Sequence, residues 1–331
     1  MILAGVRYGG VRPPCIVAEL SCNHVGDKDR AHDLIEAAAH AGADAVKFQL
    51  YAPDEMTLRS NAPAFRLTSG PWAGRTLWDL YAEAATPREW FPNLFAHVRE
   101  LGLVPFASVF SLDGIVYLET LDCPAYKIAS AEVPWLDLVR GAADTRKPVI
   151  LSDGAASDGE MADAIRACRH PVVLSCVAKY PADPGAHGFG RYVHDPATMW
   201  GLSDHSLSPT VAACAAAMGA CMIEAHLQLG DVDTLDRKHS YTPGGFQELV
   251  ETVRLGYALR RAKAAPERPD FARRLVWARD MPSGIRAAVD DVRALRCATG
   301  LSAGVAVRGT LARQVSAGEP VVMADFGTED A

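Results

Sequence analysis

Eight short apolar runs, separated by longer amphipathic stretches, constrain the fold of this chain more than any other feature. Each run has the length of a β-strand. Most runs are apolar on both faces, which is typical of a parallel sheet that is covered on both sides. The eight runs are Cys15–Leu20, Ala45–Leu50, Val104–Val109, Ala125–Ser130, Val149–Ser152, Val172–Cys176, Trp200–Ser203 and Met222–His226.

Helix signals lie between these runs. Asp27 precedes a stretch that ends at Gly42, and Pro209 starts one that ends at Gly219, which are typical residues for helix starts and ends. Eight strands with intervening helices predict an α/β fold, the (β/α)8 TIM barrel. An open doubly wound sheet is the alternative, but no Gly-x-Gly-x-x-Gly motif follows the first predicted strand.

A Pro-rich charged segment divides the chain. The barrel is expected over residues 1–265. Residues 271–331 contain short β-like runs and turn residues, and they are expected to form a small, mostly β domain. A domain of this size buries little core by itself, so we expect it to pack on another surface. Two long connections, Tyr51–Thr86 and Val177–Met199, fall on the barrel face where active sites are built.

Charge and cysteine usage argue against several classes of protein. The net charge of -7 is mild and no Lys/Arg-rich run occurs, which argues against nucleic acid as a partner. No apolar stretch approaches the roughly 18 residues of a membrane span, and the N-terminal residues lack the charged region of a secretory signal. Eight cysteines without Cys-x-x-Cys spacing are typical of the reduced cytoplasm.

Polar side chains occur at or just beyond the C-terminal ends of most of the predicted strands. A charge buried without a partner is strongly destabilising, so these groups need partners. Convergence of many polar groups at one end of a barrel is the arrangement of an active site. The residues are Glu19, Lys47, Gln49, Ser108, Lys127, Ser130, Ser152, Ser203, His205, Glu224 and His226.

Lys47 and Lys127 lie in otherwise apolar strands, within Val-Lys-Phe-Gln and Tyr-Lys-Ile-Ala-Ser. Two ammonium groups that face one cavity repel each other unless an anion lies between them, and neighbouring serines supply hydroxyl donors. The pair therefore predicts a ligand that carries phosphate, or phosphate and carboxylate. A Schiff-base lysine of an aldolase, which needs a desolvated amine of lowered pKa, is the alternative.

His205 and His226 lie at the ends of consecutive predicted strands, close enough to share a divalent metal ion. With two protein ligands, such an ion keeps open positions for water and substrate, as a Lewis-acid site requires. Six other histidines fall on predicted helix faces or loops and are expected at the surface: His32, His40, His97, His170, His187 and His194.

Six motifs, in order along nearly the whole chain, resemble the sialic acid synthase family of phosphoenolpyruvate-dependent nonulosonic acid synthases. They are Val17–Gly26, Gly42–Gln49, Tyr126–Glu132, Lys147–Gly154, Gly201–Ser206 and Ile223–His226. Within the family, Trp72–Tyr81, Thr86–Trp90 and Leu121–Tyr126 are most similar to pseudaminic acid synthases, which use a 2,4-diacetamido-2,4,6-trideoxy hexose. Arg273–Asp280 and Arg296–Ser302 resemble the antifreeze-like (SAF) domain of that family.

The resemblance implies condensation of phosphoenolpyruvate with a sugar aldehyde. It implies catalytic roles for Glu19, Lys127 and His226, and a divalent metal on His205 and His226, with Mn²⁺ expected and Mg²⁺ or Co²⁺ as alternatives. It also implies a domain-swapped homodimer, in which Arg296 reaches the site of the partner chain. Phosphoenolpyruvate is expected at Lys47, Ser108, Lys127, Ser130, Ser152 and Ser203, and the sugar at Asn23, Gln49, Glu132, Tyr180, Asp236 and Arg296.

The chain departs from the family pattern around the expected sugar. Ala107–Phe110 replaces a Ser-Thr-Pro-Phe or Ser-Ser-Pro-Phe motif, and Ala225 stands where a lysine is usual. Asp236–Ser240 keeps the acid and the serine of its motif but changes the residues between them. N-acetylmannosamine, or an unusual sugar of a specialised pathway, is therefore an alternative acceptor. A catalytically inactive sugar-acid-binding homologue is a further alternative.

Overall fold

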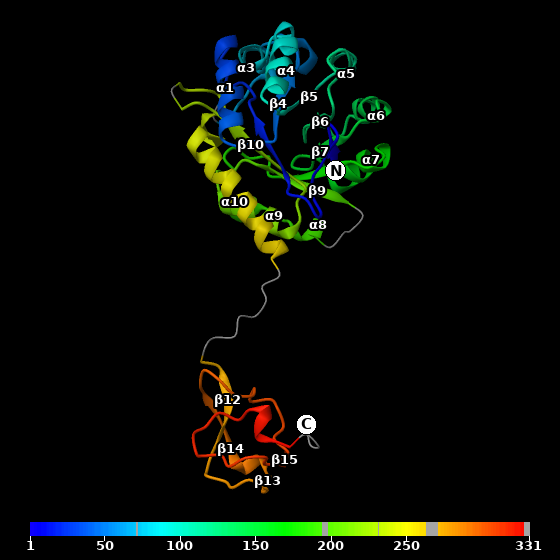
Figure 1. The fold of residues 1–331 in the computed structure, drawn as a ribbon. Helices are drawn as coiled ribbons and strands as arrows, with labels where there is room; N and C mark the ends of the chain where they lie inside the picture. Colours follow the sequence, from blue (N-terminus) through cyan, green and yellow to red (C-terminus); the bar gives the residue numbers. More distant parts are fainter. Residues whose placement is uncertain (71, 194–197, 231, 263–270, 328–331) are drawn as a thin grey trace. The chain divides into compact units, whose positions relative to one another are not determined.

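The computed structural model describes residues 1–70, 72–193, 198–230, 232–262 and 271–327. The chain divides into two compact units, Met1–Ala262 and Lys263–Ala331 (Figure 1). The expected linker, Ala265–Asp270, lies outside the described residues. In the part of the chain that is described, no helix is long and apolar enough to cross a membrane.

Eight parallel strands close into a barrel in the first unit. They neighbour one another in chain order, and the last strand pairs with both the seventh and the first. The predicted TIM barrel is thereby confirmed. The strands are β3 (Cys15–Glu19), β4 (Ala45–Leu50), β5 (Val104–Val109), β6 (Tyr126–Ile128), β7 (Val149–Ser152), β8 (Val172–Cys176), β9 (Met199–Asp204) and β10 (Met222–Leu227). A short strand, β11 (Ser240–Tyr241), pairs in parallel with β10.

The barrel strands are buried on both faces, which explains their nearly continuous apolar runs. All six residues of β5 and all six of β10 are buried. Phe48 of β4 packs against Phe91 and Phe95 of a covering helix, with ring centres 5.9 and 5.8 Å apart. The core thus has two layers, one inside the barrel and one between the strands and the helices.

Helices cover the outside of the barrel (Figure 1). Asp27 caps the first by accepting hydrogen bonds from the backbone of Asp29 and Arg30, and Gly219 ends another at a φ of 110°. The helices are α1 (Lys28–His40), α2 (Pro53–Met56), α3 (Leu77–Ala84), α4 (Phe91–Glu100), α5 (Leu112–Glu119), α6 (Leu136–Asp144), α7 (Asp158–Ala167), α8 (Gly190–Val193), α9 (Pro209–Met218) and α10 (Pro243–Arg261). Single turns are η1 (Pro63–Phe65), η2 (Arg88–Trp90), η3 (Pro184–Ala186) and η4 (Arg237–His239).

An antiparallel hairpin, β1 (Ile2–Leu3) and β2 (Val6–Arg7), lies at the N-terminal end of the barrel strands. Leu3 is fully buried in the barrel core. Gly9 packs against Cys221, just before β10, so closely that a Cβ on Gly9 would lie 2.4 Å from the Cβ of Cys221. The hairpin therefore packs at one end of the barrel, and the C-terminal ends of the strands lie at the other.

The second unit has a small core of its own. Strands β12 (Arg273–Trp277) and β14 (Val292–Arg296) pair antiparallel, as do β13 (Arg286–Ala287) and β15 (Gly309–Thr310). Two single turns, η5 (Val289–Asp291) and η6 (Met323–Asp325), complete it. Trp277 is 1% exposed at the centre, and its indole N–H donates to Asp325 Oδ2 at 3.0 Å.

Strands β8, β9 and β10 approach one another closely at Gly201, which leaves no room for a side chain there. A Cβ on Gly201 would lie 2.5 Å from the carbonyl oxygen of Met222 and 2.7 Å from Leu174 Cδ2. We expect Gly201→Ala to lower the free energy of unfolding by about 1–3 kcal/mol, because an overpacked core forces shifts of its neighbours. Gly159→Ala, in helix α7 with no atom near the new Cβ, is the control and is expected to be neutral or slightly stabilising. Denaturant unfolding followed by helical circular dichroism measures both, and equal midpoints would contradict the packing described.

Candidate active site

The C-terminal ends of the barrel strands bring most of the predicted polar residues to one cavity of about 260 Å³. The strand register is responsible, since it sets Glu19 beside Lys47, Ser108 beside Lys127, and Ser203 beside Glu224. The predicted site residues that line this cavity are Lys47, Gln49, Ser108, Lys127, Ser130, Ser152, Tyr180, Ser203, His205, His226 and Asp236.

Four predicted residues are not among those that line the cavity: Glu19, Asn23, Glu132 and Arg296. Glu19 is fully buried and forms an ion pair with Lys47, which does line it. Glu132 is half-buried after β6, and burial raises its pKa. Arg296 is exposed on β14 of the second unit.

Two buried lysines and two buried glutamates form a charge network in the cavity wall. Lys47 Nζ pairs with Glu19 and donates to Ser108 Oγ at 3.0 Å. Lys127 Nζ lies 3.4 Å from Glu224 Oε1, and Lys47 Nζ lies 3.7 Å from the same atom. The carboxylates that keep the lysines together therefore come from the protein itself, whereas the sequence had predicted an anionic ligand between them.

Burial and pairing set the ionisation of this network. Burial favours the neutral form of Lys47, but Glu19 and Glu224 outweigh it, so its pKa is raised. Burial lowers the pKa of Lys127, although Glu224 opposes the shift. For Glu224, the nearby Lys127 and Lys47 overcome burial and lower its pKa, so this carboxylate stays charged.

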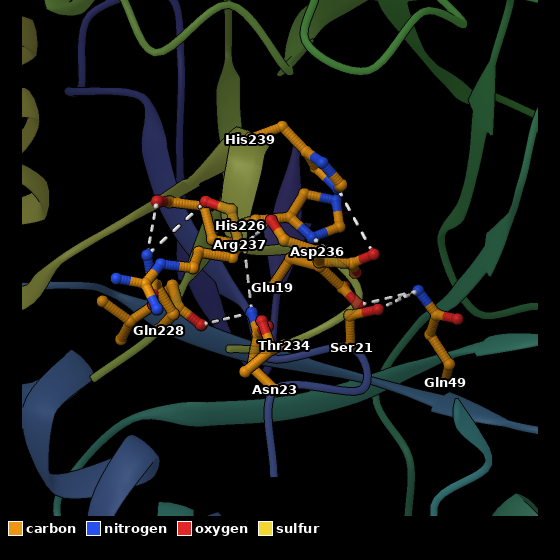
Figure 2. Close-up of polar contacts among 12 residues, drawn as sticks. Glu19, Ser21, Asn23, Gln49, His226, Gln228, Thr234, Asp236, Arg237 and His239 are labelled. Carbon is orange, nitrogen blue, oxygen red and sulfur yellow. Dashed lines mark hydrogen bonds and ion pairs between the residues drawn. The ribbon is translucent and has the colours of Figure 1, made fainter. Parts of the chain in front are cut away.

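A second cluster lies beside the first, on β9, β10 and the loop that follows β10. One carboxylate joins two imidazoles: Asp236 Oδ2 lies 3.3 Å from His226 Nδ1, and Asp236 Oδ1 lies 3.5 Å from His239 Nε2 (Figure 2). His205, directly after β9, has its ring centre 5.3 Å from that of His226. Its Nδ1 lies 3.1 Å from the carbonyl oxygen of Val177, which leaves Nε2 as the other ring nitrogen available for a ligand.

The loop that carries Asp236 is held by Asn23. The Asn23 amide donates to the carbonyl of Leu227 at 2.8 Å and to Ser240 Oγ at 3.0 Å, and its oxygen accepts from Thr234 Oγ1 at 2.5 Å (Figure 2). Asn23 is fully buried and is not among the residues that line the cavity. Its side chain is thus engaged in holding both ends of the loop that follows β10.

The remaining cavity wall combines polar and aromatic side chains. Gln49 donates to Glu19 Oε1 at 3.0 Å and to Ser21 Oγ at 3.1 Å (Figure 2). Tyr180, which is 39% exposed, packs against His205 and His239 with ring centres 4.4 and 4.7 Å away. Trp72, Tyr51 and Tyr81 add aromatic surface to the same cavity.

Sequence reasoning missed the part that His239 plays and gave Glu224 no role beyond a polar strand end. The available signal for His239 was its position inside Asp236–Ser240, where the chain departs from the family motif. The expected surface position of His187 is wrong, because its side chain is 2% exposed and its Nε2 lies 3.8 Å from Asp204 Oδ1. His194 lies outside the described residues.

The donor set of the second cluster fits a divalent metal ion. His226, Asp236 and His239 each offer one ligand atom, and these atoms lie within 4.8 Å of one another. Glu224 Oε2 is buried without a hydrogen-bond partner among the described residues, and His226 Nδ1 has only its ion-pair contact with Asp236. Imidazole nitrogens with one carboxylate oxygen are a common set for first-row divalent ions.

Comparison with known proteins identifies the family of this chain. A family model described as the NeuB family matches residues 34–263. A pseudaminic acid synthase of Helicobacter pylori is 38% identical, over 88% of this chain and 90% of that protein. A pseudaminic acid synthase of Campylobacter jejuni is 34% identical, over 86% of this chain and 88% of that protein.

Solved structures share the fold. The spore coat polysaccharide biosynthesis protein SpsE of Bacillus subtilis is 25% identical with a TM-score of 0.68, and 99% of each chain is covered. The sialic acid synthetase of Leptospira borgpetersenii, solved with citrate, is 25% identical with a TM-score of 0.70, over 81% of this chain and 92% of that chain. The predicted resemblance is therefore confirmed, and this chain belongs to the NeuB family.

Proposed function

We propose that this enzyme condenses phosphoenolpyruvate with a sugar aldehyde to give a 2-keto nonulosonic acid and phosphate. The observation that carries the proposal is one cavity that holds two buried lysines, several serine hydroxyls and an imidazole cluster. The relatives that are pseudaminic acid synthases favour a 2,4-diacetamido-2,4,6-trideoxy hexose as the acceptor.

The lysine side of the cavity suits the donor substrate. Lys47 and Lys127 supply charge-assisted hydrogen bonds to phosphate and carboxylate oxygens. Ser152 Oγ is buried without a partner among the described residues, as expected of a hydroxyl that waits for a ligand. The proposed phosphoenolpyruvate contacts are Lys47, Ser108, Lys127, Ser130, Ser152 and Ser203, of which all line the cavity.

The charge balance of the cavity calls for a cation. Glu19 and Glu224 already offset the two lysines, so a donor with two anionic groups needs further positive charge. We assign a divalent metal to His205 and His226, with Mn²⁺ preferred and Mg²⁺ or Co²⁺ as alternatives. When bound, the ion supplies Lewis-acid polarisation of the sugar aldehyde.

The reaction then proceeds between the two substrates. A bond forms between C3 of phosphoenolpyruvate and the aldehyde carbon, which leaves C2 electron-poor, and water adds there. The bond between C2 and the bridging oxygen breaks, phosphate leaves and C2 becomes the ketone. Glu19 does not line the cavity and acts on the added water through Lys47 and Gln49, which contact its carboxylate; the proton that this water loses is balanced by the one that the aldehyde oxygen gains.

The sugar is proposed to contact Gln49, Tyr180 and Asp236, which line the cavity, with Glu132 nearby. Asn23 acts on the sugar through the loop that it holds. N-acetylmannosamine or an unusual sugar remains the alternative acceptor, because Ala107, Val109 and Ala225 change the family pattern around the site. All eight cysteines are free, which is consistent with a reduced cytoplasm.

The chain is proposed to consist of a barrel domain, residues 1–265, and a SAF-like domain, residues 271–331. In a domain-swapped homodimer its Arg296 reaches the site of the partner chain. Support comes from its independent core around Trp277 and from Arg296, which is exposed on β14. The guanidinium of Arg296 can donate several hydrogen bonds to an anionic or polyhydroxyl substrate.

Phosphate release from phosphoenolpyruvate is expected to require both a divalent metal and a sugar aldehyde. His226→Ala is expected to lower kcat/KM by more than about 100-fold. Mutation of a residue that only hydrogen-bonds to a metal ligand typically lowers activity or metal affinity by roughly 10- to 100-fold, and loss of a ligand itself should cost more. His40→Ala, which changes an exposed histidine of α1, is the control. A phosphate-release assay over a panel of amino and deoxy hexoses measures this, and unchanged turnover of His226→Ala would remove the metal role.

Lys127→Met is expected to weaken phosphoenolpyruvate binding by at least about tenfold, because a hydrogen bond to a charged group is worth about 1.5–3 kcal/mol. Lys147→Met, which breaks an exposed pair with Glu119, is the matched control. Titration calorimetry with phosphoenolpyruvate measures both affinities. Equal affinities for the two variants would contradict the donor site.

Borohydride separates the synthase from the Schiff-base aldolase. We expect no mass increase when the wild-type protein is treated with pyruvate and borohydride, because Lys127 and Lys47 are each held in an ion pair with a buried glutamate, although burial lowers the pKa of Lys127. A covalent adduct that disappears in Lys127→Met would favour the aldolase instead. Intact-protein mass spectrometry reads either result.

Complementation between two inactive variants tests the domain swap. Arg296→Ala and His226→Ala homodimers are each expected to be impaired. A mixed dimer, formed by refolding the two together, contains one site with an intact barrel and an intact Arg296 from the partner. We expect mixing to restore activity well above the sum of the separate variants. Activity that stays at that sum while the mixed dimer forms would contradict the swap.

A further inference from the structure

His239 is a buried imidazole that the proposed function does not use. It lies in η4, two residues before Tyr241 of β11, and it is 3% exposed. The proposed function assigns the metal to His205 and His226 alone. Nothing in that assignment requires a third imidazole at the same place.

The three imidazoles are spaced as ligands of one ion. Metal–nitrogen bonds of about 2.0–2.1 Å bring two rings that share an ion to within about 6 Å, centre to centre. The ring centres of His226 and His239 are 4.7 Å apart, those of His205 and His226 are 5.3 Å apart, and those of His205 and His239 are 5.9 Å apart. All three rings are therefore close enough, and the ligand atoms of His226, Asp236 and His239 lie within 4.8 Å of one another.

The carboxylate of Asp236 fixes two of these rings. Its two oxygens lie 3.3 Å from His226 Nδ1 and 3.5 Å from His239 Nε2, and Figure 2 shows both rings around it. The side chain of His226 is only 9% exposed, and its Nδ1 is held near the carboxylate without a well-aligned hydrogen bond to it. A nitrogen and a carboxylate oxygen arranged in this way can share one ion.

Neighbouring residues hold His239 in place. Tyr180 packs against both His239 and His205. The Asn23 hydrogen bonds fix Ser240, the residue that follows His239, and Thr234 on the same loop. A ligand held on such supports loses little entropy when an ion binds, which favours tight binding.

We propose that His239 is the third protein ligand of the divalent metal, so that this chain binds its ion with His226, Asp236 and His239, with His205 close by. The inference rests on the proposed function, because the ion is the one that the reaction uses. A set that contains two imidazole nitrogens favours Co²⁺ and Zn²⁺ over Mg²⁺, which prefers oxygen ligands. His239 thereby sets metal preference as well as affinity.

The test is metal binding by the full-length, metal-stripped protein in the absence of both substrates. His239→Phe keeps a ring against Tyr180 and removes the nitrogen ligands. Lys238→Ala changes the exposed neighbouring residue and is the matched control. Calorimetric titration with Co²⁺ gives the affinity, and the visible ligand-field spectrum of bound Co²⁺ reports the ligand set.

We expect His239→Phe to weaken Co²⁺ binding by at least about tenfold and to change the spectrum, whereas Lys238→Ala matches the wild type. Binding of Mg²⁺ is expected to change less than that of Co²⁺. A Co²⁺ affinity and spectrum of His239→Phe equal to those of the wild type would overturn the proposal. Thermal melts with chelator check the fold, and His239→Gln replaces the variant if the phenylalanine unfolds it.

Failure of this inference is distinct from failure of the proposed function. If Co²⁺ binding depends on His239 but no sugar in the panel releases phosphate, the third ligand stands and the reaction is wrong. If phosphate is released while His239→Phe binds Co²⁺ like the wild type, the reaction stands and the third ligand is wrong.

Discussion

The structure depends on four charges buried at the C-terminal end of one barrel. Lys47 and Lys127 are held by Glu19 and Glu224, and these residues come from β4, β6, β3 and β10. Removal of one partner of such a network costs about 3–5 kcal/mol, because it leaves a charge unpaired in the interior. The barrel must therefore close in the observed register for the charges to meet. The apolar core of strands and helices stabilises the fold, and the charged C-terminal end of the barrel carries the reactive side chains.

The position of the loop after β10 depends on Asn23. Its hydrogen bonds to the backbone of Leu227 and to Thr234 and Ser240 hold the loop after β10. That loop carries Asp236 and His239 to His226 on β10. A wall with two lysines, proposed to bind the anionic donor, and a wall with three histidines, proposed to bind the metal, thus meet in one cavity. The strands fix the first wall, and a loop fixes much of the second.

The sequence predicted the barrel because buried parallel strands leave continuous apolar runs, and it predicted Lys47, Lys127, His205 and His226 because charged or metal-binding groups interrupt or end those runs. His239 lies in no such run, so its approach to His226 depends on the path of a loop, which periodicity does not encode. The partnership of Glu224 with the lysines depends on register across strands that are distant in sequence. Asn23 follows a predicted strand, but only the structure shows it bonded to a loop more than 200 residues away.

In the proposed reaction, the bond that breaks in the donor is the one between C2 and the bridging oxygen. The most direct measurement uses phosphoenolpyruvate with heavy oxygen in the bridge between C2 and phosphorus, incubated with Mn²⁺ and the diacetamido-trideoxy hexose. The account predicts that all heavy oxygen leaves with phosphate and that the sugar gains the three carbons of pyruvate. Heavy oxygen in the keto acid, or phosphate released without a lengthened sugar, would contradict it.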